Sequence, residues 1–160
     1  MSPLYALHLA DERIGRAGFP LRLNPRFRWS LYTVFAFMFV TGVAWLCADQ
    51  LKGAAGEDFW QATAAWLLML HGGAAMVTLL LLGALMPLHA NRAWRSKKNR
   101  ATGAGMVTFN IALIATSFGL YYIAGDSVRP WMSSIHIAAG CGLPVFLLVH
   151  IANGRRARSR

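Results

Sequence analysis

The chain has 160 residues, of which 56% are hydrophobic and only 14% are charged. An average soluble domain carries about 25% charged residues, so this chain has too few charges to cover a water-facing surface. Lys and Arg outnumber Asp and Glu by 16 to 6, which gives a net charge of +10. The basic residues are grouped between long apolar stretches, which indicates a membrane protein and argues against a nucleic-acid-binding domain.

Four apolar stretches are long enough to cross a bilayer as helices, which requires about 20 residues each. They cover residues 29–48, 60–89, 102–124 and 131–153, and none contains Asp, Glu, Lys or Arg. A β-barrel is excluded because runs such as LLLLGALM lack the alternation that barrel strands need. The sequence therefore predicts an all-α membrane protein, a four-transmembrane-helix up-down bundle.

The basic residues lie almost entirely on one side of the predicted membrane. Fourteen of them precede the first span, connect the second to the third, or follow the fourth, whereas only Lys52 and Arg129 occupy the two opposite loops. Because cytoplasmic segments carry the excess of Lys and Arg, we expect both termini in the cytoplasm. The expected organisation is a basic cytoplasmic segment at 1–28, a membrane domain at 29–153 and a basic cytoplasmic tail at 154–160, in a bacterial inner membrane.

Four of the five histidines lie inside the predicted spans: His71 and His89 in the second, His136 and His150 in the fourth. Ionisable residues at membrane depth are costly and indicate function, although a single His can also serve as an interhelical hydrogen-bonding group. On an α-helix, positions 18 apart return to the same face, and positions 14 apart lie about 40° from alignment. Each helix therefore presents its two imidazoles along one stripe.

The second and fourth spans run in the same direction, which matches their histidines by depth. His71 and His136 are expected towards the outer side, and His89 and His150 towards the cytoplasmic side. At about 1.5 Å per residue, the two levels are about 27 Å apart on one helix and about 21 Å on the other, a mismatch that tilt or the prolines of these helices must absorb. Two imidazoles at one depth are the axial ligands that a b-type haem needs, and two such pairs form an electron path through the bilayer.

Zinc or copper fits these histidines less well, because tetrahedral zinc sites recruit Cys or carboxylates or cluster several His. The third span adds a second feature: Gly105, Ala112 and Gly119 recur every seven residues on one face. A macrocycle inside a bundle needs small neighbours, so we expect Gly105 near the cytoplasmic pair and Gly119 near the outer pair. Close helix packing through small residues explains the same pattern, and both explanations stay open.

With these residues the chain resembles the di-haem membrane cytochromes b, in particular the four-helix haem core of the cytochrome b of bc complexes. In that family alternate helices each supply two His, and an intervening helix supplies glycines against the haems. The resemblance covers residues 60–153 and implies two bis-His haem b groups, an outer one and a cytoplasmic one. The unequal His spacings depart from the family, as does the absence of its extra helices and quinone-site loops. The small bacterial superoxide-oxidising cytochromes b are also similar in size, but they take a ligand from the first helix, and this first span has no His.

The expected function is electron transfer across the membrane between the quinone pool and a partner redox protein, as the membrane subunit of a larger oxidoreductase complex. A free-standing haem b oxidoreductase acting on a small molecule such as superoxide is the alternative within this class. A transporter or proton relay without haem is the alternative of another class, but a relay needs His or carboxylates at the midplane, where none of the four His sits. A structural anchor without cofactor leaves the shared stripes unexplained. Membrane lipid, quinone and partner redox subunits are the expected partners, nucleic acid is not, and no catalytic residue is assigned.

Overall fold

A computed structural model describes residues 23–52, 57–95, 99–123 and 125–156. The described residues form helices and no strand. The four long helices are α2 (Pro25–Leu51), α3 (Glu57–Leu85), α5 (Arg100–Phe118) and α6 (Arg129–Arg156). The π-helical turn η1 (Met86–Ala90) and the short helix α4 (Asn91–Arg95) continue α3, and the π-helical turn η2 (Gly119–Ile123) continues α5.

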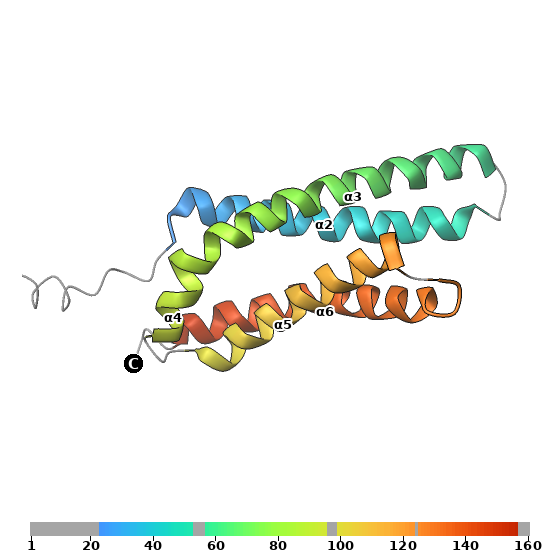
Figure 1. Cartoon of the computed structure of the whole chain (residues 1–160). Coiled ribbons are helices and arrows are strands. Elements are labelled where there is room, and N and C mark those ends of the chain that lie inside the picture. Colours follow the sequence, from blue (N-terminus) through green and yellow to red (C-terminus); the bar gives the residue numbers. More distant parts are fainter. Residues whose placement is uncertain (1–22, 53–56, 96–98, 124, 157–160) are drawn as a thin grey trace, which may run out of the picture.

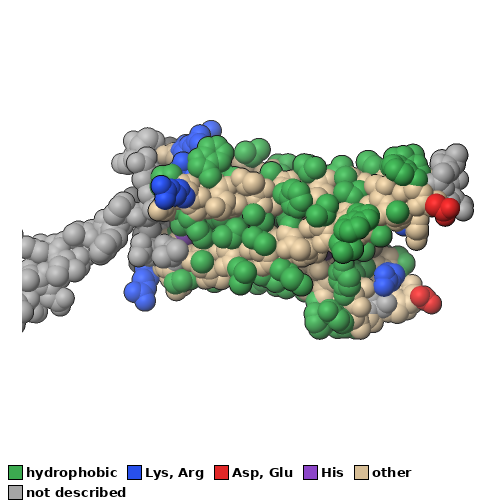
Figure 2. Space-filling model, turned by 90° about the horizontal axis from the view of Figure 1, so that it is seen from above, with side chains coloured by type: hydrophobic (Ala, Val, Ile, Leu, Met, Phe, Trp, Pro, Cys, Tyr) green, Lys and Arg blue, Asp and Glu red, His purple; other side chains and the backbone are tan. Residues whose placement is uncertain are grey.

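All four long helices are long and apolar enough to cross a membrane, which confirms the four predicted spans and makes the chain a multi-pass membrane protein. Helices α2 and α6 extend a few residues beyond both ends of their predicted spans, whereas α3 and α5 begin slightly earlier than predicted and give way to π-helical turns before the predicted ends. Large apolar side chains such as Leu80 (76% exposed) lie on the outer surface of the bundle. Figure 2 shows hydrophobic side chains along the length of the molecule between its two ends. Such a surface is stable against lipid and not against water.

The helices are arranged as two antiparallel hairpins that form two layers (Figure 1). Helix α2 packs along α3, and α5 packs along α6, and these are the closest helix contacts among the described residues. At its start, α2 is capped by the Asn24 side chain, which accepts a hydrogen bond from the Arg26 backbone N–H at 3.0 Å, and Pro25 occupies the first turn. The start of α2 and the end of α6 lie at the same end of the bundle, as the up-down prediction requires.

The two ends of the bundle differ in charge. Arg26, Arg28, Arg95, Arg100, Arg155 and Arg156 belong to the end where α2 begins and α6 finishes. Asp49, Asp58 and Asp126 belong to the opposite end, where Lys52 donates a hydrogen bond to Asp49 at 2.7 Å. Figure 2 shows this division: the side chains at the end where α2 begins are basic, and the acidic side chains lie at the opposite end, together with a few basic ones. Placement of the basic end in the cytoplasm stays a prediction, and residues 1–22 and 157–160 of the two predicted cytoplasmic segments lie outside the described residues.

The π-helical turn η1 contains both Pro87 and His89. Pro87 has no backbone N–H for an α-helical hydrogen bond, so the regular pattern changes here, and a π turn places more residues in one turn than an α-helix does. Helix α3 also runs obliquely to α6 (Figure 1). The π turn and this inclination absorb the difference between the spacings of 18 and 14 residues. Pro144, in contrast, lies within α6 without interrupting it.

The interior of the bundle holds few large side chains. The buried hydrophobic residues in the described part of the chain are two leucines and three alanines: Leu31, Ala48, Ala64, Ala139 and Leu143. No large side chain is fully buried there, and the buried polar residues are the three threonines Thr41, Thr78 and Thr116. A bundle held together by its own core fills this space with close-packed apolar side chains. The two hairpins are therefore not joined by such a core.

Candidate functional site

The four membrane histidines lie in two pairs, and each pair takes one ring from the α3–η1 segment and one from α6. The ring centres of His71 and His136 are 6.4 Å apart, and the ring planes are inclined at 74°. The ring centres of His89 and His150 are 6.3 Å apart, and the planes are inclined at 85°. These are the two pairs predicted from the rise of the helices, which places His71 level with His136 and His89 level with His150.

The separation between the ring centres equals that of two imidazoles that share one metal atom. A metal–nitrogen bond of about 2.0 Å, followed by about 1.15 Å from nitrogen to ring centre, gives about 6.3 Å between the centres of two collinear ligands. A direct hydrogen bond of about 2.9 Å between ring nitrogens would bring the centres to about 5.2 Å. Edge-to-face contact between two rings covers a range of about 4.5–7 Å. The distance therefore fits a shared metal well but also agrees with simple ring packing.

In the outer pair, a threonine hydroxyl from the neighbouring helix of the same hairpin binds each ring. Thr41 Oγ1 on α2 lies 3.1 Å from His71 Nδ1. Thr116 Oγ1 on α5 lies 2.9 Å from His136 Nδ1. Both threonines are buried, at 4% and 5% exposed. The two hairpins therefore hold the two outer rings in the same way.

The threonine hydroxyls also favour one of the two neutral protonation states of each outer ring. Thr41 Oγ1 lies 2.8 Å from the Phe37 carbonyl oxygen, and Thr116 Oγ1 lies 2.7 Å from the Ala112 carbonyl oxygen. With the single hydroxyl proton donated to the carbonyl, the hydroxyl oxygen can only accept from the ring, so this arrangement matches an Nδ1–H imidazole. The neutral imidazole then has its lone pair on Nε2, which is the nitrogen able to bind a metal.

In the pair of His89 and His150, called the inner pair from here on, His150 is held by two residues at the start of α5. Thr102 Oγ1 lies 3.0 Å from His150 Nδ1 and donates to the Asn99 side-chain oxygen at 2.6 Å. Asn99 Nδ2 in turn donates to the His150 backbone carbonyl at 3.2 Å. Asn99 has a left-handed backbone conformation with φ of 56°, which Asn tolerates better than most residues. Asn99 Nδ2 also lies 3.5 Å from His150 Nδ1, which is too long for a strong hydrogen bond, so the 3.0 Å bond with Thr102 is the one that matches an Nδ1–H ring, as in the outer pair.

Two further glycines face these rings, although only Gly42 lies so close that a side chain there would crowd its ring. A Cβ atom on Gly42 would lie 3.2 Å from His71 Cε1, and one on Gly103 would lie 4.0 Å from His150 Cε1. Each glycine directly follows a threonine that binds the same ring. The dipeptide Thr-Gly occurs only twice in the sequence, at 41–42 and 102–103, so this repeat is the signal that could have revealed both contacts.

Gly105 and Gly119, the predicted neighbours of a cofactor, face side chains of α6. A Cβ atom on Gly105 would overlap the Phe146 ring, and one on Gly119 would lie 3.2 Å from Met132 Sδ. Phe146 and Met132 each precede a histidine of α6 by four residues, so the two glycines lie close to the levels expected for them. They allow α5 and α6 to pack closely at these levels. A contact of either glycine with a cofactor stays a prediction.

The described residues contain no group of three or more His, Cys, Asp or Glu side chains that could hold a metal ion. Each histidine pair instead offers two nitrogen ligands. Two nitrogens alone leave most coordination positions of a transition metal unfilled, whereas a tetrapyrrole fills four positions of its iron and leaves two axial ones. The donor set of each pair therefore fits a haem iron.

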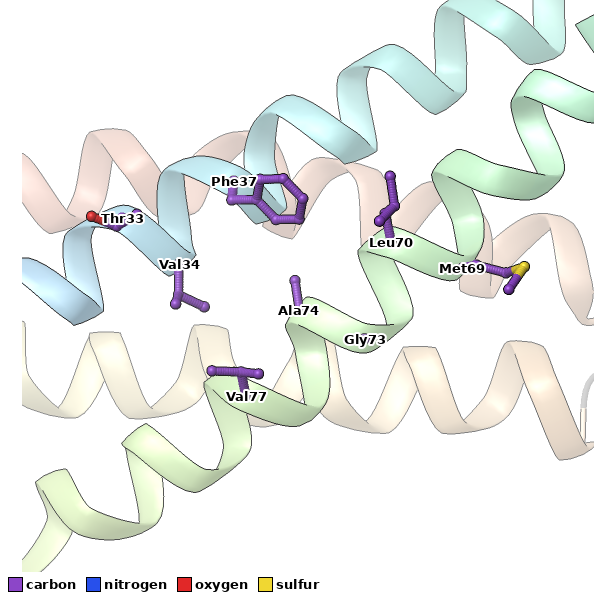
Figure 3. A pocket seen from close by; sticks show the side chains of 8 residues that line it. All are labelled: Thr33, Val34, Phe37, Met69, Leu70, Gly73, Ala74 and Val77. Carbon is purple, nitrogen blue, oxygen red and sulfur yellow. The ribbon is translucent and has the colours of Figure 1, made fainter.

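A groove of about 400 Å³ lies between α2 and α3, apart from the histidine pairs (Figure 3). It is lined by Thr33, Val34 and Phe37 of α2 and by Met69, Leu70, Gly73, Ala74 and Val77 of α3. Met69 is 64% exposed and Phe37 is 43% exposed, so the groove opens on the outer surface of the bundle. None of its lining residues is a metal ligand of the kind that the histidine pairs offer.

Comparisons of the chain with protein-family models, curated proteins and solved structures find no match, so its family is not established and the resemblance to the di-haem cytochromes b stays an expectation.

Proposed function

We propose that this chain is a di-haem b membrane cytochrome that transfers electrons across the membrane. His71 and His136 would hold the outer haem, and His89 and His150 the inner one. The observation that carries the proposal is the ring-centre separation of 6.4 Å in one pair and 6.3 Å in the other, which matches two imidazoles on one iron.

The protonation pattern favours metal binding over simple ring packing. For His71, His136 and His150, the hydrogen bonds to neighbouring side chains all use Nδ1. A metal-binding histidine typically has this arrangement, with Nδ1–H donated to an acceptor and Nε2 directed to the metal. Simple ring packing would not require three rings on two helices to use the same nitrogen, Nδ1, for these hydrogen bonds.

The interior of the bundle supports a prosthetic group between the hairpins. Few residues of the described part of the chain are buried, and no large side chain is fully buried there. Each histidine pair connects one layer to the other, so a group bound by both rings would join the hairpins where the protein's own core does not. Haem b, held by two imidazoles, supplies one-electron oxidation and reduction at its iron.

The two pairs lie at different depths of one bundle, and this supports electron transfer across the bilayer. His136 and His150 are 14 residues apart on α6, which corresponds to about 21 Å along the helix axis. We further propose that the basic end faces the cytoplasm of a bacterium, and that the quinone pool and a partner redox subunit exchange electrons with the two sites. The chain's own residues bind and orient the two redox groups and exclude water from them.

The experiment that tests the proposal is a visible spectrum of the detergent-purified protein, oxidised and then reduced with dithionite. We expect low-spin b-type bands and about two haems per chain, because two axial imidazoles produce a low-spin iron. A colourless preparation from cells supplied with haem precursor would reject the proposal. Rapid consumption of superoxide by the isolated reduced or oxidised protein would favour the free-standing oxidoreductase over the subunit of a larger complex.

A further inference from the structure

We infer that Thr41 and Thr116 are positioning residues of the outer site: their hydroxyl groups hold His71 and His136 in the Nδ1–H form and thereby set the reduction potential of the outer haem. This inference rests on the proposed function. It assigns a role to α2, which carries no histidine and which the ligand pattern alone leaves outside the site.

The hydroxyl groups are suited to this task because their own protons are already engaged. Each threonine donates to a backbone carbonyl of its own helix, at 2.8 Å for Thr41 and 2.7 Å for Thr116. This second bond fixes the rotamer of a side chain that is already stiff at χ1. Both threonines are buried, so water does not compete for the Nδ1–H of either ring.

The same two contacts involve all four long helices in the outer site. Thr41 on α2 holds His71 on α3, and Thr116 on α5 holds His136 on α6. Each hairpin thus supplies one ligand together with its own hydrogen-bond acceptor. A Cβ atom on Gly42 would also crowd the His71 ring, so α2 fixes this ring at two points.

An acceptor on Nδ1–H changes the properties of the metal ligand. It draws the proton away from the ring, which makes Nε2 more basic and stabilises the more highly charged, oxidised iron. Loss of the acceptor should therefore raise the reduction potential of the outer haem. It also allows the ring to take the Nε2–H form, which cannot bind the metal, so the affinity for haem should fall.

The test uses Thr41→Val and Thr116→Val, which keep the side-chain shape but remove the hydroxyl. Thr41→Ser and Thr116→Ser keep the hydroxyl and should behave as the parent protein. Thr78→Val is the matched control, because Thr78 is also buried at 7% and donates to the Ala74 carbonyl at 2.8 Å, but forms no hydrogen bond with a histidine of the described residues. The readouts are the reduction potential of each haem by spectroelectrochemistry and the rate of haem transfer to apomyoglobin.

We expect each Val variant to raise the potential of the outer haem and to weaken its binding by about 10-fold or more, with the inner haem unchanged. Equal results for Thr41→Val, Thr116→Val and Thr78→Val in a protein that holds two haems would overturn the inference and leave the proposed function intact. Because two threonines are tested, the inference can still be checked if one variant protein fails to insert into the membrane.

If the purified protein binds no haem, the proposed function fails and the inference is tested on the rings themselves. Nitrogen-15 spectra of the histidine-labelled, haem-free protein distinguish the Nδ1–H form from the Nε2–H form. The Nδ1–H form at His71 and His136, with its loss in the two Val variants, would support the role of the threonines. The Nε2–H form in the parent protein would overturn it.

Discussion

The outer and inner histidine pairs have nearly the same ring separation, but they are held by different parts of the molecule. Two buried hydroxyls bind the outer rings: Thr41 lies well inside α2, and Thr116 lies near the end of α5, just before the π-helical turn that continues it. At the inner pair, His150 depends on Thr102 and Asn99, which lie at the very start of α5, beside the connection between the hairpins. The comparison indicates that the outer site is part of the helix interfaces, whereas the inner site depends on how α5 begins.

The largest expected effect comes from substituting the histidines, because each substitution should affect the haem of its own pair and spare the other. His71→Ala or His136→Ala should remove the outer haem, and His89→Ala or His150→Ala the inner one, because each variant removes one of the two side chains that would bind the iron and hold the haem between the hairpins. Haem content should fall by about half in each variant, measured by the pyridine haemochrome method. His8, which precedes the first span in the sequence and lies outside the described residues, is the control. Loss of the inner haem in His71→Ala would contradict the pairing.

The second effect concerns the glycines that face the rings. Gly42→Ala places a Cβ atom 3.2 Å from His71 Cε1, which is closer than carbon atoms normally approach, whereas Gly103→Ala places one at a relaxed 4.0 Å from His150 Cε1. We expect Gly42→Ala to weaken the outer haem by about 10-fold, as loss of a group that orients a ligand does, and Gly103→Ala to leave the inner haem almost unchanged. The measurement is the rate of haem transfer from each site.

Gly73→Ala is the control for Gly42→Ala, because a Cβ atom there meets nothing within 4 Å. In that position alanine should only favour the helix, by about 1 kcal/mol. An equal loss of haem in Gly73→Ala and Gly42→Ala would mean that the contact with His71 is not the cause.

A third, smaller effect tests the dependence of the inner site on Asn99. Asn99→Gly removes the side-chain bonds but tolerates the φ of 56°, and Asn99→Ala removes the same bonds and adds strain of about 1–2 kcal/mol. Both variants should weaken the inner haem by several-fold and spare the outer one, and the Ala variant should lower the thermal stability more than the Gly variant does. Outer-haem loss in Asn99→Gly would show that the two sites are not held independently.

The smallest difference concerns the ring planes, inclined at 74° in the outer pair and 85° in the inner pair. Nearly perpendicular imidazole planes leave two iron d orbitals close in energy, which produces a strongly anisotropic low-spin signal in electron paramagnetic resonance. We expect this signal from both haems, with the larger anisotropy at the inner one. Rhombic signals of the kind that parallel rings produce would mean that the rings rotate when haem binds.

Some features of the molecule are accessible from short stretches of sequence. The four long helices are predictable because each apolar run is local and of bilayer length, and lipid accepts only structures that satisfy their own backbone hydrogen bonds. The grouping of His71 with His136, and of His89 with His150, follows from the regular rise of two parallel helices. On ideal helices the unequal His spacings, 18 residues on one helix and 14 on the other, would leave the two rings of a pair at different levels. The π turn at Pro87 helps to resolve this mismatch, but it is not visible in a periodic pattern.

The sequence by itself determined the four helices, their up-down order and the two levels at which histidines occur, because these depend on local hydropathy and on helical geometry. Only the tertiary structure decided which side chains bind Nδ1 of the rings and which glycines face them. These contacts depend on the rotation of α2 about its axis relative to α3 and of α5 relative to α6, and helix rotation is set by packing between distant segments. Thr41 on a helix without histidine illustrates the difference, since nothing in its own stretch of sequence connects it with His71.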